Sequence, residues 1–495
     1  MSIRPQVPFG GVQGEDGYCT NYFKIKRMGS CRMIHRRHNF LWVPATFIVF
    51  LVLGLVQICL ASEMRAGVAK VEITPPLGTS MWGYYDRTDG AKGELDPLYA
   101  RVLVLESGNT RLAYVDLDLG RTFGPSSLES LRKAAKQNSG INDLIVQATH
   151  MHTGPVIKDE YPNGPPAWET EDLNRIERAI KDAVEHTVPV RMGVGYGAAY
   201  IGYNRRHVDP DGSISMLWSN TTQVPTYPVD PLLAVLRIDR MDGEPLAILV
   251  NYAAHPVTFG SDALRYSADF PGAMCKVVEH AFGDKPLAFF VQGAAGDINV
   301  FDAGTPINLD VIGRRDWAGE TLGKAAVNTA QQIQTSVDPD SEIDFANQPL
   351  ALKFRWDPEK FKQEALRELD PKAYDIYVSP IEETMNLPVT TALINRKIAI
   401  VGMPGEPFVD FQTDLRAKCP VKDCFFLGYT NGYYGYFPTI KAANEGGYGA
   451  GSMDTWVQVG AGEEMENFAL FQIYRMLGRF QDVPNTNWKN LPPAP

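Results

Sequence analysis

From about Val68 onward, short apolar runs alternate with longer amphipathic segments. Several of the runs contain almost no polar position, which is typical of strands that are covered on both faces of a sheet. The predicted strands are Ala100–Glu106, Arg111–Asp116, Leu144–Ala148, Leu233–Ile238, Leu246–Asn251, Leu287–Val291, Lys397–Val401 and Phe425–Gly428.

The segments between these runs carry apolar residues at helical spacing. In Asp172–His186 the apolar side chains recur every three or four positions, which predicts an amphipathic helix. The other predicted helices are Ser126–Lys136, Gly319–Thr335 and Met465–Phe480. Strands that alternate with helices favour a layered α/β fold, with a mixed sheet flanked by helices. We interpret residues 64–495 as one large domain in which Phe301–Asp316 forms a loop.

The first 61 residues are set apart from this pattern by an apolar run behind a basic leader. The run extends from about Phe40 to Ala61, and all the basic residues of this segment precede it. A basic region, an apolar stretch and small residues at its end are typical of a secretory signal, here with cleavage before Ser62. The run is also close to the roughly 20 residues that span a bilayer, so an uncleaved anchor is the alternative. Either interpretation predicts an exported protein that is periplasmic, secreted or membrane-anchored.

Charge and cysteine content narrow the classes of function. Without residues 1–61 the chain keeps 40 of its 47 basic and 56 of its 58 acidic residues, which is a net charge of −16. An acidic protein repels the phosphate backbone, so we expect no nucleic-acid partner. Cys419 and Cys424 are candidates for a disulfide in an oxidising compartment, which leaves Cys275 unpaired. The sequence indicates no oligomeric state.

Side chains that bind metal ions follow three of the predicted strands. The pair His150 and His152 follows Leu144–Ala148, and His255 follows another strand. Glu406 lies in a Pro/Gly turn after a third. Ligands of open α/β sheets bind beyond the carboxyl ends of the strands, so we expect these side chains to share one rim. Histidine and carboxylate around an open position are the usual ligands of a catalytic zinc ion. Taken singly, each motif has a plainer alternative: a surface loop, a structural histidine or a solvated glutamate.

Two further strand ends carry aromatic or small residues. Tyr429–Tyr436 contains four tyrosines, a composition that suits a substrate wall or the core. Gln292–Asn299 is rich in glycine and alanine, which lets a backbone approach a ligand closely. We expect Gly293, Asp297 and Asn299 to contact a substrate. The sequence contains no His-Glu-x-x-His motif, no Gly-x-Ser-x-Gly motif and no phosphate-binding loop.

Taken in order, these motifs resemble the neutral/alkaline non-lysosomal ceramidase family. The resemblance extends from Gly67 to about Tyr448. The matching segments are Gly67–Pro76, Thr149–Pro155, Asn204–Arg206, His255-Pro256, Gln292–Asn299, Pro404–Glu406 and Asn431–Tyr436. Each motif is short, but their order over nearly the whole chain is specific. The resemblance implies a zinc-dependent hydrolase of an amide bond, such as the N-acyl linkage of ceramide or a related lipid amide, that is able to contact a membrane surface.

The resemblance also implies roles for single residues. The residues that it assigns to zinc are His150, His255, Glu406 and Tyr436, with Tyr433 and Tyr434 as alternatives to the last. The residues that it makes catalytic are His152, Arg205 and Tyr448. His152 would move a proton toward the leaving amine, and the other two would stabilise the oxyanion.

The chain departs from the family at two points. Asn299 stands where the family has a serine, so a serine-nucleophile mechanism is not carried over. We also expect no C-terminal immunoglobulin-like domain of the kind that the family has, which weakens the case for a membrane-lipid substrate. Two alternatives therefore stay open. One is a zinc hydrolase of a non-lipid amide such as an N-acyl sugar, and the other is a non-catalytic metal- or ligand-binding protein of the same fold.

Overall fold

The computed structural model describes residues 63–480, apart from 225, 370, 372, 375–377, 379 and 380. All elements named below belong to the unit Ala61–Pro495. The predicted leader over residues 1–61 lies outside the described residues, so signal and anchor stay predictions. Within the described part of the chain, no helix has the length and apolar character needed to cross a bilayer.

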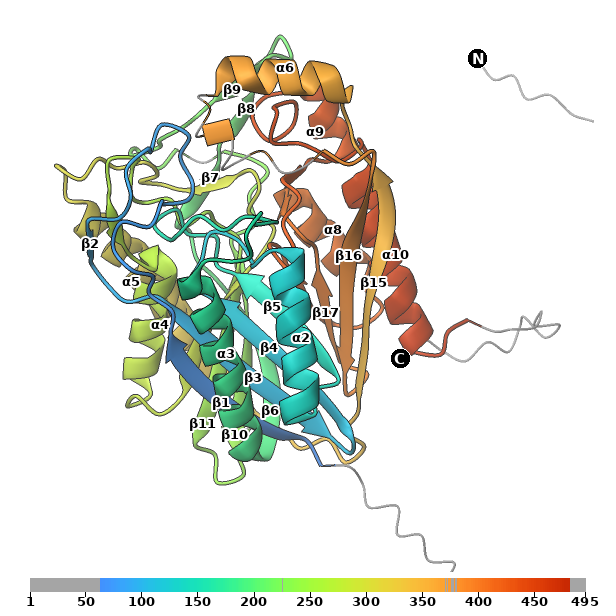
Figure 1. The fold of residues 1–495 in the computed structure, drawn as a ribbon. Coiled ribbons are helices and arrows are strands. Elements are labelled where there is room, and N and C mark those ends of the chain that lie inside the picture. The colour runs from blue at the N-terminus through green and yellow to red at the C-terminus, as the bar shows by residue number, and fades with distance from the viewer. Residues whose placement is uncertain are drawn as a thin grey trace, which may run out of the picture. The chain divides into compact units, whose positions relative to one another are not determined.

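The larger of two main sheets has eight strands in the order β13-β11-β10-β6-β1-β3-β4-β5 (Figure 1). Their bounds are Arg65–Glu72 (β1), Tyr99–Ser107 (β3), Thr110–Leu117 (β4), Asp143–Ala148 (β5), Val188–Ala198 (β6), Leu232–Arg240 (β10), Pro245–Tyr252 (β11) and Leu287–Gln292 (β13). The pairs β4–β5 and β11–β13 are parallel, and the other neighbours are antiparallel. The prediction of a mixed sheet is therefore confirmed.

The smaller sheet has four strands in the order β15-β16-β17-β19, of which β17 and β19 are parallel. Their bounds are Ile343–Lys353 (β15), Thr384–Ile394 (β16), Ile398–Gly402 (β17) and Asp423–Leu427 (β19). All eight predicted strands are present in the two sheets, but β1, β6, β15 and β16 were not predicted. In β15 the polar run Asn347-Gln348 and the following Pro349 interrupt the apolar pattern.

The two sheets pack face to face, which explains the nearly continuous apolar runs. Along β3, Val102 and Val104 face a core that they share with α2 (Pro125–Ser139) and α3 (Ala167–Glu185). Leu103 faces the opposite way, into a core shared with β16 and β19 of the smaller sheet. Because successive side chains point to opposite faces, both faces of this strand have to be apolar.

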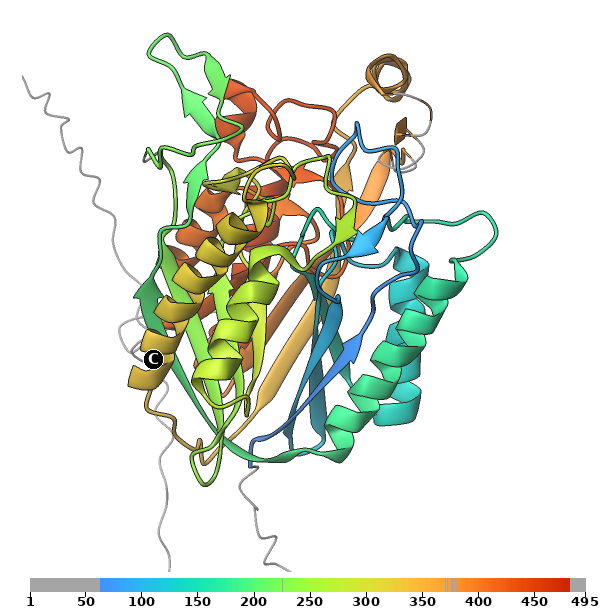
Figure 2. The same ribbon diagram turned by 90° about the vertical axis from the view of Figure 1, so that its left-hand side faces the viewer.

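Helices cover the outer faces of both sheets. Figure 2 shows α4 (Asp269–Ala281) and α5 (Val311–Gln332) side by side over the larger sheet, where they share a core with β10, β11 and β13. The smaller sheet packs against α8 (Val409–Lys418) and α10 (Ala461–Met476). The result is a four-layer arrangement of helices, sheet, sheet and helices.

The remaining elements are short. They are β2 (Gly93–Glu94), β7 (Gly202–Asn204), β8 (Arg206–Val208), β9 (Ile214–Met216), β12 (Arg265–Tyr266), β14 (Ile298–Val300), α6 (Pro358–Glu368), β18 (Glu406–Pro407), β20 (Tyr436–Phe437) and α9 (Ile440–Glu445).

The predicted helices Gly319–Thr335 and Met465–Phe480 are present with earlier starts, as α5 and α10, and this shortens one predicted loop. The interpretation of Phe301–Asp316 as a loop fails at its end, because α5 begins at Val311. The side chain of Asp310 accepts a hydrogen bond from the backbone N–H of Gly313, and this N-cap starts the helix despite the glycine in its first turn.

A buried ion pair holds the end of β4, just before the loop that leads to the candidate site. Arg101 Nη1 lies 2.9 Å from Asp118 Oδ2, and the two side chains are 3% and 1% exposed. We predict that Arg101→Met lowers the free energy of unfolding by about 3–5 kcal/mol, because it leaves a buried carboxylate without its cation.

Arg111→Met is the matched control for this change. Its pair with Glu106 is partly exposed, with 35% and 17% of the side chains accessible, so its loss should cost about 1 kcal/mol or less. Urea unfolding of both variants measures the difference. Equal losses of stability would contradict the assigned importance of the buried pair.

Candidate metal centre and active site

The loops that follow the parallel strand pairs meet at one end of the two sheets. His150 follows β5, His255 follows β11, and Glu406 begins β18 after β17. Since β18 pairs with β20 in the register Glu406–Tyr436, these two residues lie side by side. All four side chains are almost fully buried. The structure thus brings together the four residues that the resemblance assigns to zinc.

Glu406 lies between the two buried histidines. Its Oε2 is 3.2 Å from His150 Nε2 and 2.9 Å from His255 Nε2. The other ring nitrogens face backbone carbonyls: His150 Nδ1 is 2.6 Å from the oxygen of Gly120, and His255 Nδ1 is 3.0 Å from that of Ile298. A carbonyl oxygen only accepts, so Nδ1 carries a proton on both rings. In the neutral rings, the Nε2 lone pairs therefore face a carboxylate oxygen.

These facing acceptors require a cation or further protons between them. Burial lowers the pKa of His255 to about 4, so its ring is uncharged at neutral pH. Burial raises the pKa of Glu406, but His150 and His255, in the forms that carry a proton on Nε2, outweigh this and hold it well below its usual range. Rings without that proton need a cation in its place. A divalent cation satisfies all three groups, and a histidine whose second nitrogen donates to a carbonyl is the usual form of a metal ligand.

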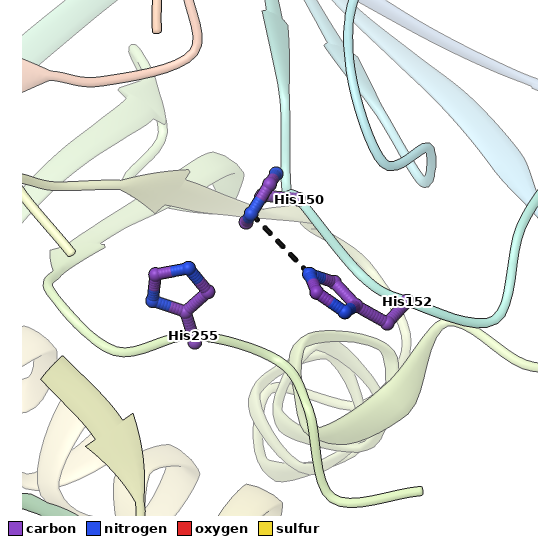
Figure 3. Close-up of side chains that lie close together, drawn as sticks. All are labelled: His150, His152 and His255. Carbon is purple, nitrogen blue, oxygen red and sulfur yellow. Dashed lines mark hydrogen bonds between the residues drawn. The ribbon is translucent and has the colours of Figure 1, made fainter. Parts of the chain in front are cut away.

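His152 adds a third imidazole to the cluster. Its Nε2 is 3.4 Å from His150 Nε2, and His150, His152 and His255 each place a ring nitrogen within 4.8 Å of the others (Figure 3). Burial lowers the pKa of His152 well below its usual range, and a positive charge on His150 would lower it further. The three rings alone are able to hold a metal ion. The contacts of Glu406 with two of them favour those two as ligands and leave His152 for another role.

The backbone around the cluster is strained. His150, Tyr429 and Asn431 have φ angles of 68°, 53° and 59°, in the left-handed region that costs about 1–3 kcal/mol for a non-glycine residue. The ring of Tyr429 stacks on that of His150, with centroids 4.1 Å apart and an interplanar angle of 22°. Such outliers gather at functional sites, where the surrounding contacts enforce them.

Tyr433 contacts Glu406. From the sequence, Tyr433 was only an alternative to Tyr436 as a zinc ligand. Its hydroxyl donates to Glu406 Oε1 at 2.5 Å. The three neighbouring tyrosines therefore separate in space: Tyr434 directs its hydroxyl to the carbonyl of Asn386 at 3.5 Å, whereas Tyr436 contacts an arginine. The spacing of these tyrosines gave no signal that distinguished them, because it does not determine the turns between them.

Arg205 forms the next layer of the site. Its Nη2 donates to the hydroxyl oxygen of Tyr436 at 3.0 Å and to the carbonyl of Gly296 at 2.7 Å. Its Nη1 lies 3.3 Å from Asn299 Oδ1, and its guanidinium carbon lies 5.0 Å from the ring centroid of Tyr448. Its Nε is buried and has no hydrogen-bond partner within the described part of the chain. One N–H of a permanent cation therefore lacks an acceptor among the described residues.

A pocket of about 710 Å³ opens onto these groups, which is within the usual range for ligand sites. The predicted site residues in its lining are His150, His152, Arg205, Asn299, Glu406, Tyr436 and Tyr448. Two predicted substrate-binding residues have other contacts. Asp297 accepts from the side chain of Asn204 at 2.6 Å and from the N–H of Val409 at 2.9 Å. Gly293 donates its N–H to the carbonyl of Tyr252 at 2.8 Å. Both residues stabilise the loop, and a substrate contact for them stays a prediction.

No protein-family model matches the chain. The chain is 25% identical to the neutral ceramidase of Pseudomonas aeruginosa over 315 residues, which cover 59% of this chain and 46% of that protein. The match thus spans less than half of the relative's length. The crystal structure of neutral ceramidase from Pseudomonas aeruginosa has a TM-score of 0.66 and 18% identity, over 86% of this chain and 76% of that one. A ceramidase complexed with C2 also has a TM-score of 0.66, with 17% identity over 86% and 77% of the two chains. The chain is therefore related in sequence and in fold to the neutral ceramidases, as the order of its motifs predicts.

Proposed function

We propose that the chain is a zinc-dependent hydrolase that cleaves an amide bond. The observation that carries the proposal is the position of Glu406 Oε2, 3.2 Å and 2.9 Å from the Nε2 atoms of His150 and His255. Two imidazoles and a carboxylate are a common ligand set of catalytic zinc. Tyr436 lies beside Glu406 and supplies the fourth candidate ligand.

When bound, a zinc ion supplies Lewis-acid polarisation of the amide carbonyl and lowers the pKa of water to about 7. The other steps belong to side chains of the chain. His152 is uncharged at neutral pH, so it accepts a proton from the attacking water and passes it to the amide nitrogen. The C–N bond then breaks with an amine as the leaving group. Arg205 and Tyr448 line the same pocket, where their donors stabilise negative charge on the carbonyl oxygen in the transition state.

The relatives support a lipid amide as the substrate. The curated relative is a neutral ceramidase, and the pocket of this chain has aromatic walls, which include Trp218 and Tyr448, that suit an apolar chain. A non-lipid amide is the second candidate, because the same pocket also contains Asp86 and Asp454. We propose zinc as the metal on the nitrogen and oxygen donors of the cluster.

Metal content and amidase activity test the proposal together. We expect about one zinc ion per chain, release of the amine from a fluorescent N-acyl-sphingosine, and loss of this activity with a chelator. His255→Ala should lose both metal and activity, since it removes one of the two imidazoles that contact Glu406.

His280→Ala is the matched control, because it removes the same kind of side chain at a position where that side chain is 87% exposed. It should retain both metal and activity. Full activity in a metal-free His255→Ala protein would overturn the scheme. Zinc without cleavage of the sphingosine amide would direct the search to other amides.

The hydrogen bond from Tyr433 to Glu406 predicts that the Tyr433 hydroxyl contributes to metal affinity without being a ligand. We expect Tyr433→Phe to weaken zinc binding about 10–100-fold, because groups that orient a metal ligand contribute that much. Tyr434→Phe is the control, since its hydroxyl faces a backbone carbonyl at 3.5 Å. Competition with a chromophoric chelator measures both affinities. If the two variants bind zinc equally well, Tyr433 does not position Glu406.

A further inference from the structure

Tyr429 packs against both buried candidate imidazole ligands, although it is neither a candidate ligand nor a residue of the proposed reaction. Its ring stacks on that of His150, with centroids 4.1 Å apart and an interplanar angle of 22°. It meets the ring of His255 edge-on, at 6.4 Å and 84°. The side chain is completely buried and does not belong to the lining of the adjoining pocket. Its contacts are therefore with the protein and not with a substrate.

The backbone of Tyr429 connects the two segments that carry His150 and Glu406. Its N–H donates to the carbonyl of Gly405 at 2.8 Å, and its carbonyl accepts from the N–H of Ala148 at 3.2 Å. These partners stand one residue before Glu406 and two residues before His150. A displacement of Tyr429 would thus disturb two candidate ligands together.

The conformation of Tyr429 is one that a large side chain disfavours. Its φ angle is 53°, in the left-handed region that glycine adopts without steric cost. A tyrosine is held there only if its surroundings enforce the conformation. The stack on His150 is a contact of this kind, and glycine could not supply it.

The hydroxyl of Tyr429 is a buried donor without an acceptor. It has no hydrogen-bond partner within the described part of the chain. Burial raises the pKa of this hydroxyl well above its usual range, and a negative charge on Glu406 would raise it further. The hydroxyl therefore keeps its proton at neutral pH and lies within electrostatic reach of that carboxylate. Buried polar groups are normally satisfied, so this exception needs an explanation.

The carboxylate of Glu406 has acceptor capacity for this hydroxyl. Its Oε2 faces the two imidazoles, and its Oε1 accepts from Tyr433 at 2.5 Å. Because a carboxylate oxygen accepts about two hydrogen bonds, Oε1 keeps one unused position among the described residues. A donor that lacks an acceptor thus lies near a candidate ligand that can accept.

We propose that Tyr429 is a positioning residue of the metal centre, whose ring orients the imidazole of His150 and whose hydroxyl supports the carboxylate of Glu406. The ring and the hydroxyl then act on two different ligands. This inference rests on the metal centre of the proposed function and assigns to it a residue that binds neither metal nor substrate.

The test compares the zinc affinities of the wild-type protein, Tyr429→Phe and Tyr429→Leu, by competition with a chromophoric chelator. Tyr429→Phe removes only the hydroxyl, so we expect zinc to bind about 10-fold more weakly. Tyr429→Leu also removes the stack on His150, and the loss should reach about 100-fold. Tyr266→Phe is the matched control, because it removes the hydroxyl of another buried tyrosine, which donates to the carbonyl of Pro76 at 3.1 Å. It should keep the wild-type affinity.

Two further readouts separate positioning from a general loss of structure. In thermal melting of the metal-free proteins, Tyr429→Phe should match the wild type, because its hydroxyl forms no hydrogen bond among the described residues. Tyr266→Phe should melt at a lower temperature, since it breaks a hydrogen bond. The visible absorption of the cobalt-loaded proteins reports the coordination geometry. We expect shifted bands in Tyr429→Leu, where the ring of His150 loses its support, and wild-type bands in Tyr429→Phe.

Equal zinc affinities of the wild-type protein and both Tyr429 variants would overturn the inference. A parallel loss of affinity and melting temperature in Tyr429→Phe would also overturn it, because the residue would then be structural. If Tyr429→Leu fails to fold, Tyr429→Phe decides alone, since it keeps the ring.

None of these measurements requires turnover, so they are independent of the proposed reaction. A protein whose zinc affinity depends on Tyr429 but which cleaves no amide retains the inference and loses the proposed function. Amide cleavage by a protein whose Tyr429 variants bind zinc normally has the opposite meaning.

Discussion

The candidate metal site depends on one buried contact, in which the carboxylate of Glu406 lies against two imidazole rings. Its Oε2 faces the Nε2 atoms of His150 and His255, whose Nδ1 atoms donate to the carbonyls of Gly120 and Ile298. Those carbonyls orient the rings, so the facing lone pairs are a consequence of backbone geometry. Three buried acceptors that face one another are unfavourable by themselves and become favourable around a cation. The positions of these groups therefore depend on the loops that carry them.

The packing of the two sheets holds these loops. Gln147, at the end of β5, donates to the carbonyls of Gln292 and Gly428 at 2.7 Å and 2.8 Å, and so ties one sheet to the other. Asn251 on β11 does the same for Val291 and Phe426, at 2.9 Å each. Buried amides satisfied in this way specify one arrangement of the strands, because any slip would leave their polar groups unpaired. The strained backbone of His150 and Tyr429 is maintained at this junction.

The pocket combines a candidate metal centre with two oppositely charged side chains, Arg205 and Asp454. Arg205 is supported by Asn299, whose Oδ1 lies 3.3 Å from its Nη1. The residue that stands in place of the family serine thus contacts the guanidinium, and an amide side chain has no nucleophilic oxygen to attack a substrate. Asp454 adds a negative group to the same pocket.

The sequence by itself determined the alternation of buried strands and helices and the residue types of the site. Strands such as β3 and β11 were predictable because burial on both faces requires continuous apolar runs, and His150, His255 and Glu406 were predictable because they follow such strands. The tertiary structure alone decided that the strands form two stacked sheets, that Tyr433 contacts Glu406 while Tyr436 contacts Arg205, and that Asp454 lies in the pocket. Periodicity reports only which side of an element is buried. Contacts such as that of Gln147 with Gly428, 281 residues apart, depend on how whole layers pack, and no local pattern encodes that.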